Sequence, residues 1–473
     1  MLVIWAHLGT LFAIVETCWV IGLSVWIVQE RRSPVSTLAW IFGLALLPVV
    51  GIPLYVLFGP RRLLRRKLRY RDRRVAVTRA LAKIPERRIP PELGQLMAIG
   101  VSTQHTPATT ATRVQIYRSG DEVYRAILDA IGQSRHHVHV EYYIFEDDAV
   151  GAALRDALTE RARAGVVVRV LVDAAGSPRA GASFFRPLLE AGGKFARFNP
   201  PRLGRLWASS FNFRTHRKIV VVDGRVGFTG GMNVAGCHSE SASGSEAWRD
   251  THLLVEGPIV HDLQRTFLEN WAFAFGQAPT TNQYFPELPE GDHLAQLLRS
   301  GPDRDVFPIH AFLFSAIATA RERVLLTTPY LVPDEPMLTA LKSAAQRGVK
   351  VDILVPAKSD LPLVRAAART YYQELLASGC RVYEYAPRMM HAKTLVVDQA
   401  LACVGTSNMD NRSFRLNFEV MAVLYGTSFA GELEEHFRED LRDSVLVNKQ
   451  LLSRESRFVR LTEAAARLIS PLL

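Results

Sequence analysis

Residues 215–223 read THRKIVVVD and residues 390–398 read MHAKTLVVD, so the chain carries one short pattern twice. Each copy continues to a glycine and an asparagine at the same distance, and both fit His-x-Lys-x4-Asp-x6-Gly-x-x-Asn. The matching positions are His216, Lys218, Asp223 and Asn233 in the first copy and His391, Lys393, Asp398 and Asn408 in the second. One copy of so short a motif arises by chance, but two copies with identical spacing indicate a duplication. Residues two apart along a strand face the same side, so each histidine is expected to point the same way as its lysine.

The sequence around the two motifs repeats as well. A helical stretch, a strand, a helix and an apolar strand follow one another over residues 130–172 and again over residues 316–355. Gly165 and Gly348 stand at equivalent points, where a helix ends and a strand begins. This position favours a residue that adopts the left-handed backbone conformation, with positive φ. Alternating helices and apolar strands predict an α/β fold with two sandwich domains, each with a largely parallel or mixed sheet. Two such copies form a pseudo-two-fold pair, and functional sites often lie between domains.

The boundaries of these parts follow from the repeat and from the composition. Gly276 to Asn282 is expected to begin the crossover between the two halves. The predicted parts are a membrane hairpin over residues 1–60, a basic connector over 61–110, a first domain over 111–290 and a second domain over 291–473.

The first 60 residues contain two apolar segments. Residues 2–28 hold few polar groups, Glu16 among them, and residues 36–58 contain no charge at all. Twenty-three residues of helix extend about 34 Å, enough to cross a hydrocarbon core of about 30 Å. No lysine or arginine precedes Arg31, which disfavours a cleaved signal peptide. We therefore expect a transmembrane hairpin with spans at about 3–28 and 36–58.

The positive charge of the chain is concentrated in one place. The 473 residues carry a net charge of +11, and residues 61–74 alone hold nine basic residues and one acidic residue. Only +3 remains for the rest of the chain, which favours a lipid surface over nucleic acid as the anionic partner. By the positive-inside rule, the N-terminus and everything after residue 58 are expected on the cytoplasmic side. Fixing this topology is an alternative role for the arginines, and both roles are compatible.

The duplicated residues suit phosphoryl transfer. Two lysines and two asparagines supply donors for the phosphate oxygens, and two histidines divide the remaining work between nucleophile and general acid/base. This scheme requires no metal or other cofactor. The four cysteines are widely spaced and form no zinc pattern. His137, His139 and Glu141 alternate along a predicted strand as metal ligands do, but the chemistry does not need them.

The paired motifs resemble those of the phospholipase D superfamily, and this resemblance covers roughly residues 114–473. Within the superfamily, the chain is similar to the bacterial cardiolipin synthases. The stretches that carry the second resemblance are residues 38–59, 141–145, 248–252, 328–334 and 470–473. The resemblance implies an enzyme that transfers a phosphatidyl group from one phosphatidylglycerol to another, giving cardiolipin and glycerol through a phosphohistidine. It also implies residence in the bacterial cytoplasmic membrane, with the catalytic domains on the cytoplasmic side.

Roles for individual residues follow from the resemblance and from triad logic. His216 is assigned as nucleophile and His391 as acid/base, although the opposite order remains open. The lysines and asparagines are expected to bind phosphate, whereas Asp223 and Asp398 are expected to stabilise the local backbone. A reacting histidine needs an acceptor for its other nitrogen, and the candidates are Asp250 and Glu419.

Several alternatives stay open at this point. A membrane-bound phospholipase D hydrolase or another phosphatidyltransferase fits the same motifs, and phosphatidylethanolamine fits as well as phosphatidylglycerol as second substrate. A nuclease or an inactive scaffold is disfavoured, because charge gathers near the membrane segment and both motifs are complete. Oligomeric state, acyl-chain preference and the role of Glu16 are not encoded in any pattern. The apolar residues of the C-terminal tail, Phe458, Leu461, Leu468 and Leu472, are expected to pack on the second domain.

Overall fold

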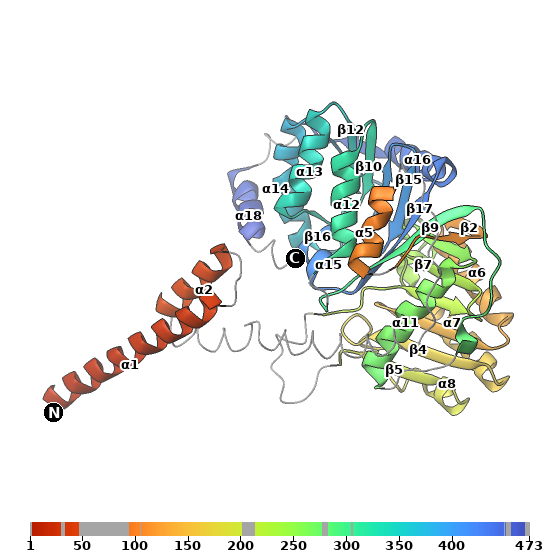
Figure 1. The fold of residues 1–473 in the computed structure, drawn as a ribbon, viewed down its shortest axis with the longest axis horizontal. Helices are drawn as coiled ribbons and strands as arrows, with labels where there is room; N and C mark the ends of the chain where they lie inside the picture. The colour runs from red at the N-terminus through yellow and green to blue at the C-terminus, as the bar shows by residue number, and fades with distance from the viewer. Residues whose placement is uncertain are drawn as a thin grey trace. The chain divides into compact units, whose positions relative to one another are not determined.

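The structure is a computed structural model, drawn as a ribbon in Figure 1. It divides into two compact units, one formed by Met1–Leu68 with Pro201–Phe211 and the other by Arg69–Pro200 with Asn212–Leu473. The residues that it describes are 2–29, 34–46, 94–104, 106–200, 213–276, 282–303, 306–448, 450 and 456–468.

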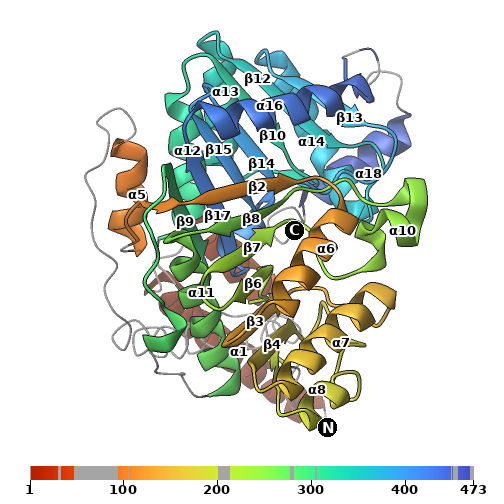
Figure 2. The same cartoon turned by 90° about the vertical axis from the view of Figure 1, so that its right-hand side faces the viewer.

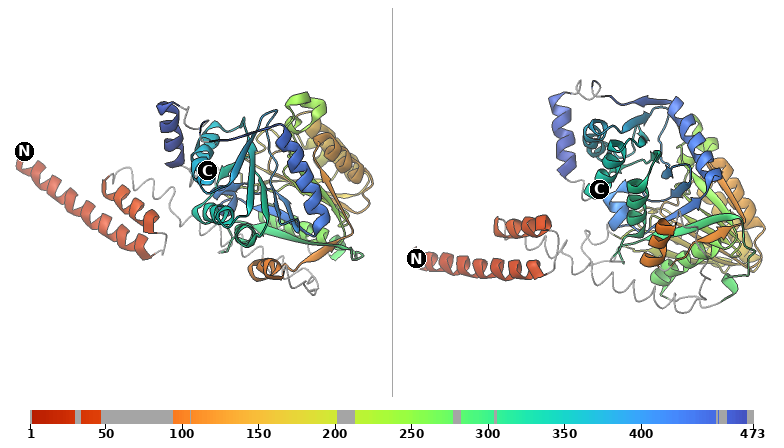
Figure 3. Two further views of the ribbon diagram at one scale, coloured as in Figure 1. Left: turned by 90° about the horizontal axis from the view of Figure 1, so that it is seen from above. Right: turned by 45° about the horizontal axis from the view of Figure 1, so that its top comes forward.

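The first unit contains the two N-terminal helices. α1 (Leu2–Gln29) and α2 (Pro34–Leu46) contact one another and lie side by side, in red in Figure 3. No helix in the described part of the chain has the length and hydropathy that a membrane crossing requires. The expected second span continues past Leu46, where the described residues end. The side chain of Glu16 and the basic segment at 61–74 also lie outside the described part of the chain.

The first half of the second unit is built on a seven-stranded sheet. Its β3, β4 and β5 are parallel, and its other neighbouring pairs are antiparallel. The strand order is β2 (Arg113–Tyr117), β8 (His252–Glu256), β7 (Val226–Gly230), β6 (Ile219–Val222), β3 (His137–Tyr142), β4 (Val167–Asp173) and β5 (Lys194–Phe198). The helices of this half are α6 (Gly120–Gly132), α7 (Ala149–Arg163), α8 (Arg186–Glu190), α10 (Glu240–Ser243) and α11 (Ile259–Phe275).

The second half repeats this topology. In its sheet, β10, β12 and β13 are parallel and the rest are antiparallel. The strand order is β1 (Thr109–Ala111), β9 (His293–Ser300), β17 (Glu419–Tyr425), β15 (Leu401–Gly405), β14 (Thr394–Val397), β10 (Arg323–Thr327), β12 (Lys350–Pro356), β13 (Arg381–Tyr385) and β18 (Ser444–Leu446). Its helices are α12 (Pro308–Thr319), α13 (Glu335–Gln346), α14 (Pro362–Ala377), α15 (Asn411–Arg415), α16 (Thr427–Arg442) and α18 (Arg457–Leu468), and α5 (Gly94–Gln104) packs on α12. A separate two-stranded sheet pairs β11 (Leu331–Val332) with β16 (Met409–Asp410), and single-turn helices η1 (Gly236–His238), η2 (Gly244–Glu246) and η3 (Asn282–Tyr284) complete the elements.

The predicted α/β fold with two repeated domains is confirmed, and both sheets are mixed. The left-handed positions are confirmed too, since Gly165 and Gly348 have φ angles of 86° and 91°. These glycines let a helix reverse into a buried strand without the steric cost that a Cβ atom would add.

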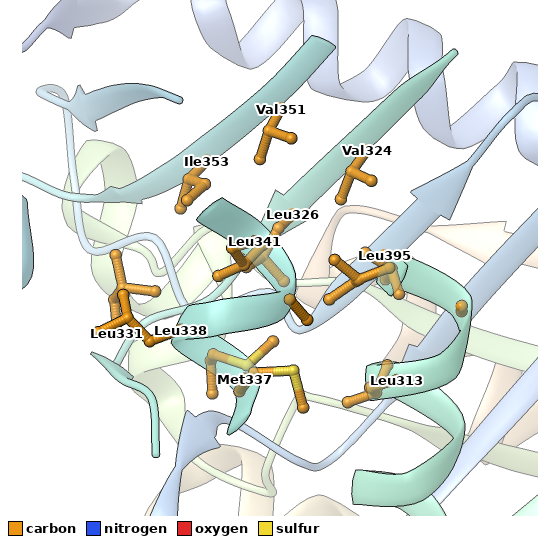
Figure 4. Packing of buried hydrophobic residues seen from close by; sticks show 14 of the residues in the cluster. Leu313, Val324, Leu326, Leu331, Met337, Leu338, Leu341, Val351, Ile353 and Leu395 are labelled. Carbon is orange, nitrogen blue, oxygen red and sulfur yellow. The ribbon is translucent and has the colours of Figure 1, made fainter. Parts of the chain in front are cut away.

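The protein has three apolar cores among its described residues, and one of them joins the two halves. One lies between α6, α7 and the first sheet, and another lies between α12, α13 and the second sheet, where Leu341 and Leu326 pack together (Figure 4). The third core joins the two sheets and contains Val221 and Leu253 of the first with Val404 and Val420 of the second. Figure 2 shows β7 and β8 beside β17 and β15. Burial of this apolar face makes the pairing of the halves part of folding.

The end of the predicted connector is ordered against the second half. β1 pairs with β9 at the edge of the larger sheet. The side chain of Gln104 donates to the carbonyl of Leu297 at 2.8 Å, and that of Gln296 donates to the carbonyl of Met97 at 3.1 Å. Residues 94–104 and 109–111 therefore pack as part of the second half, although they precede the first half in sequence.

Candidate active site

The two motifs lie just before equivalent strands. β6 begins at Ile219 and β14 begins at Thr394, so each histidine and lysine belongs to an extended segment that leads into its strand. The spacing of the motif predicted these residues within the strands, but they lie a few residues before the strands begin.

Each motif segment pairs with the opposite half of the molecule. Thr215 forms an isolated β-bridge with Phe418, and the backbone N–H of His216 donates to the carbonyl of Phe418 at 2.9 Å. By the same arrangement, Met390 bridges Arg249, and the N–H of His391 donates to the carbonyl of Arg249 at 2.7 Å. The residues that follow the bridge partners are Glu419 and Asp250. Each histidine thus lies beside a carboxylate from the other half.

The contact of His216 with Glu419 fixes its ring. Nδ1 of His216 lies 3.0 Å from Oε2 of Glu419 and 3.0 Å from the carbonyl oxygen of Thr406. Both neighbours are acceptors, so Nδ1 carries the proton and Nε2 keeps its lone pair. The hydroxyl of Thr406 also donates to Glu419, which orients the carboxylate. This tautomer suits a nucleophile or base.

The second histidine has a matching partner. Nδ1 of His391 lies 2.6 Å from Oδ2 of Asp250, and the other oxygen of Asp250 accepts the backbone N–H of Thr251 at 2.7 Å. Both carboxylates are fully buried. A buried charged acceptor makes a strong hydrogen bond and holds the imidazole in one orientation.

The two lysines are buried beside the histidines. Nζ of Lys218 donates to the carbonyl of His216 at 2.8 Å, and Nζ of Lys393 donates to the carbonyl of His391 and lies 2.9 Å from its Nδ1. Burial, with repulsion from Lys393, lowers the pKa of Lys218 to about 7. Burial lowers the pKa of Lys393 to about 8, although Asp250 and Glu419 oppose this shift. An anionic ligand would restore the positive charge of both ammonium groups.

Burial also acts on the histidines. It lowers the pKa of His216, with Glu419 opposing the shift, and it lowers the pKa of His391 well below 6.5, helped by the nearby lysines. Both rings are therefore neutral at pH 7, and a bound phosphate would favour their protonated forms.

The two motif asparagines are buried and make hydrogen bonds with nearby residues of their own halves. Oδ1 of Asn233 accepts the backbone N–H of Ile144 at 3.3 Å, and the backbone N–H of Asn408 donates to the hydroxyl of Ser413 at 3.2 Å. Oδ1 of Asn408 is buried and has no hydrogen-bond partner among the described residues. Both asparagine side chains are buried. In each of them, Nδ2 is the atom that can donate to a phosphate oxygen, since Oδ1 only accepts.

The motif aspartates lie at the other end of their strands. The carboxylate of Asp223 accepts the backbone N–H groups of Arg135, His136 and His137, each at 2.8 Å. Asp398 does the same for the three residues at the start of β10, at 2.7 to 3.0 Å. These carboxylates anchor the start of the strand next to the motif strand.

Aromatic rings that no sequence pattern indicated surround the two histidines. The ring of Tyr143 lies 5.0 Å from that of His216, and Trp248 lies 5.0 Å from His391. His238 lies 5.5 Å from His391, five residues after the motif asparagine, where the second copy has Ser413. The two copies differ at this position, and aligning them would have drawn attention to His238.

One group of residues near the site has the composition and spacing of metal ligands. Ligand atoms of His238, Asp250 and His391 lie within 4.8 Å of one another, the one such group among the residues that the structure describes. The ammonium of Lys393, 2.9 Å from Nδ1 of His391, would repel a cation there. These residues therefore fit a metal ion poorly.

The alternating residues of β3 are engaged in hydrogen bonds. His139 contacts Arg169 at 2.9 Å and Gln264 at 2.8 Å, and Glu141 accepts from Asn270 at 2.5 Å. They form a buried polar network with side chains of β4 and α11, which is the ordinary structural role for such residues.

Comparison with known proteins supplies independent evidence. A family model described as cardiolipin synthase, PLD-like domain, matches residues 127–271 and 313–441, and a phospholipase D-nuclease N-terminal model matches residues 18–60. Cardiolipin synthase 1 of Bacillus anthracis is 38% identical, covering 98% of this chain and 95% of that protein. Cardiolipin synthase of Geobacillus kaustophilus (strain HTA426) is 37% identical, covering 98% and 94%.

Solved structures share the fold. The phosphatidylserine synthase of Haemophilus influenzae Rd KW20 matches with a TM-score of 0.62 at 12% identity, over 80% of this chain and 100% of that one. The polyphosphate kinase of Porphyromonas gingivalis matches with a TM-score of 0.50 at 16% identity, over 78% of this chain and 53% of that one.

Proposed function

The chain belongs to the cardiolipin synthases of the phospholipase D superfamily, and from this premise we propose how its own residues carry out the reaction. It is a phosphatidyltransferase that makes cardiolipin. The observation that carries the proposed mechanism is the pair of buried dyads, His216 with Glu419 and His391 with Asp250, each drawn from both halves.

The first step forms a covalent intermediate. Nε2 of His216 attacks the phosphorus of phosphatidylglycerol, and the bond from phosphorus to the headgroup glycerol oxygen breaks. His391, protonated once the phosphate is bound, gives its proton to that oxygen, and free glycerol leaves. The products are neutral His391 and a phosphatidyl group on His216.

The second step reverses the proton transfer. The headgroup hydroxyl of a second phosphatidylglycerol attacks phosphorus, and neutral His391 accepts its proton. The bond from phosphorus to Nε2 breaks, which releases cardiolipin and restores His216. Lys218, Lys393, Asn233 and Asn408 are proposed to bind the phosphate oxygens in both steps, where the negative charge develops.

The buried carboxylates act through the histidines. Glu419 keeps the proton of His216 on Nδ1, which leaves Nε2 free to attack. Asp250 stabilises the imidazolium form of His391 when the phosphate arrives. Asp223 and Asp398 are proposed to support the backbone and to stay away from the substrate.

We propose further that the N-terminal region is a membrane hairpin with spans at about 3–28 and 36–58. The apolar composition of both segments and the family match over residues 18–60 support this proposal. The basic residues at 61–74 would hold the catalytic domains, divided near residue 290, on the cytoplasmic side of the bacterial inner membrane. Labelling of Arg32→Cys and Val75→Cys with a membrane-impermeant thiol reagent tests this topology. Position 32 should react only from the outer side and position 75 only from the cytoplasmic side, whereas Cys18, inside the first span, should stay unlabelled.

Product analysis tests the reaction itself. Purified full-length protein is incubated with phosphatidylglycerol, beside His216→Ala, His391→Ala and the control His293→Ala, whose ring is partly exposed on β9. We expect cardiolipin and equimolar glycerol from the wild type and the control alone. Phosphatidic acid as the main product would show water to be the acceptor, and turnover by either catalytic variant at the wild-type rate would overturn the two-histidine mechanism.

A further inference from the structure

The C-terminal helix α18 packs on the body of the protein through its polar side. It lies along α14, as Figure 1 shows. Oε1 of Glu463 accepts from Nε of Arg369 at 2.9 Å, and Arg467 donates to Glu374 at 2.8 Å. Ala466 is the small residue that fills the contact, since it is 3% exposed. Ion pairs and an alanine therefore hold this helix in place.

The large apolar residues of α18 point away from the body. Phe458, Leu461 and Leu468 are 74%, 68% and 82% exposed. Their spacing of three and seven residues puts them on one stripe of the helix, which we call the α18 face. The expectation that Phe458, Leu461 and Leu468 pack on the second domain is therefore wrong, because the helix uses its opposite side for that contact. Leu472, which was part of the same expectation, lies outside the described residues.

Further apolar residues lie near the start of this helix. Glu463 pairs with Arg369 and the later Arg467 pairs with the later Glu374, so α18 and α14 run in the same direction. The beginning of α18 is thus level with the beginning of α14, where Leu361 and Leu363 are 45% and 49% exposed. Exposure of several large apolar side chains together marks a contact surface.

The charge of α18 indicates what this surface contacts. The helix contains Arg457, Arg460 and Arg467 against a single acidic residue, Glu463. A helix with an apolar stripe and an excess of arginine is typical of segments that lie in the interface of an anionic membrane. The proposed substrate, phosphatidylglycerol, is itself an anionic membrane lipid.

We propose that the α18 face inserts into the headgroup region of an anionic phospholipid bilayer and so presents the second domain to the surface that holds the substrate. This inference rests on the proposed function, because it takes the membrane that contains phosphatidylglycerol as the partner. The α18 face contains none of the residues assigned to the reaction, so the two are open to independent tests.

Photo-cross-linking identifies what covers the face. The photoreactive residue p-benzoylphenylalanine replaces Phe458 in the full-length protein, which is placed in vesicles of phosphatidylglycerol and phosphatidylethanolamine. The matched control carries the same residue in place of Phe275, a 43% exposed phenylalanine at the end of α11. We expect phospholipid adducts, detected by mass spectrometry, at position 458 and at least about fivefold fewer at 275. Cross-links from 458 to a second copy or to another segment of the chain, or equal lipid adducts at both positions, would overturn the proposal.

A kinetic comparison tests the consequence. In Phe458→Glu/Leu461→Glu, charges replace the apolar contacts with lipid, so the vesicle phosphatidylglycerol needed for half-maximal rate should rise about tenfold. With phosphatidylglycerol dispersed in detergent micelles, the rate should stay within about twofold of wild type, since the site is untouched. Leu189→Glu, on a 40% exposed leucine of α8, serves as control in both assays.

The outcomes separate this proposal from the proposed function. Equal loss of activity in micelles and vesicles, or no change in vesicles, would overturn the membrane role of α18. A failure of the proposed function would show instead as wild-type protein without cardiolipin product in either medium.

Discussion

Asp250→Asn is the substitution that probes the pairing of the two halves most directly. Asparagine has nearly the same shape, but it removes the negative charge that lies 2.6 Å from Nδ1 of His391. The variant therefore keeps the packing of the site and weakens the stabilisation of the imidazolium form that both steps require.

The size of the effect follows from the burial of this contact. Asp250 is fully buried and His391 is 5% exposed, so water does not replace the lost partner. A hydrogen bond to a charged group contributes about 1.5–3 kcal/mol, and about 1.36 kcal/mol corresponds to a tenfold change in rate. We expect kcat for cardiolipin formation to fall about 10- to 150-fold, with the thermal unfolding temperature close to wild type. Asp156→Asn, on the exposed surface of α7, is the control.

A second donor makes the assay specific for the role of His391. A phosphatidyl ester of p-nitrophenol releases a leaving group that needs no proton, so its burst of p-nitrophenol reports the attack by His216 alone. With this donor, Asp250→Asn should form the intermediate at nearly the wild-type rate, whereas Glu419→Gln should remain slow. A wild-type kcat for Asp250→Asn with phosphatidylglycerol would refute the reasoning. If the p-nitrophenol burst were normal in Glu419→Gln and slow in Asp250→Asn, the nucleophile would be His391.

Three further predictions concern pH, stability and metal ions. The pKa values of about 7 for Lys218 and about 8 for Lys393 mean that both lysines lose their charge as the pH rises, so kcat/KM should fall above about pH 7. Because bound phosphate keeps the lysines protonated, kcat should fall only at higher pH. A flat kcat/KM profile from pH 6 to 9 would contradict this prediction. Asp223→Asn should lower the free energy of unfolding in urea by about 1–2 kcal/mol and leave kcat unchanged, because the carboxylate binds three backbone N–H groups and touches no reacting group. Burial raises the pKa of Asp223, but the three N–H groups lower it by more, so the pKa in the folded protein is below that in the unfolded chain. The stabilisation is therefore present above the pKa of the unfolded chain and is lost as the pH falls through the pKa of the folded protein. The difference in stability between Asp223→Asn and wild type should shrink in acid. Addition of EDTA should leave the rate within about twofold, since the lysines supply the positive charge at phosphate, and a loss restored by a divalent cation would show that a metal takes part.

Much of the fold could be predicted because it is written as local pattern. Gly165 and Gly348 mark helix ends through the φ angles that they adopt, and the apolar runs around residues 166–172 and 349–355 form parallel strands as expected. The interpretation of the C-terminal tail failed for a specific reason. The spacing of Phe458, Leu461 and Leu468 shows that they share one face of a helix, but spacing does not show which face meets the protein.

The duplicated histidines, lysines and asparagines, and with them the chemistry, were determined by the sequence alone, because residue type and spacing suffice to recognise phosphoryl transfer. The partner of each histidine was decided only by the tertiary structure. Asp250 follows the first motif and Glu419 follows the second, yet Asp250 binds His391 and Glu419 binds His216. The physical reason lies in the apolar faces of the two sheets, which must be buried against each other. Their packing brings each motif segment into a β-bridge with the other half, across distances in the sequence that no local pattern records.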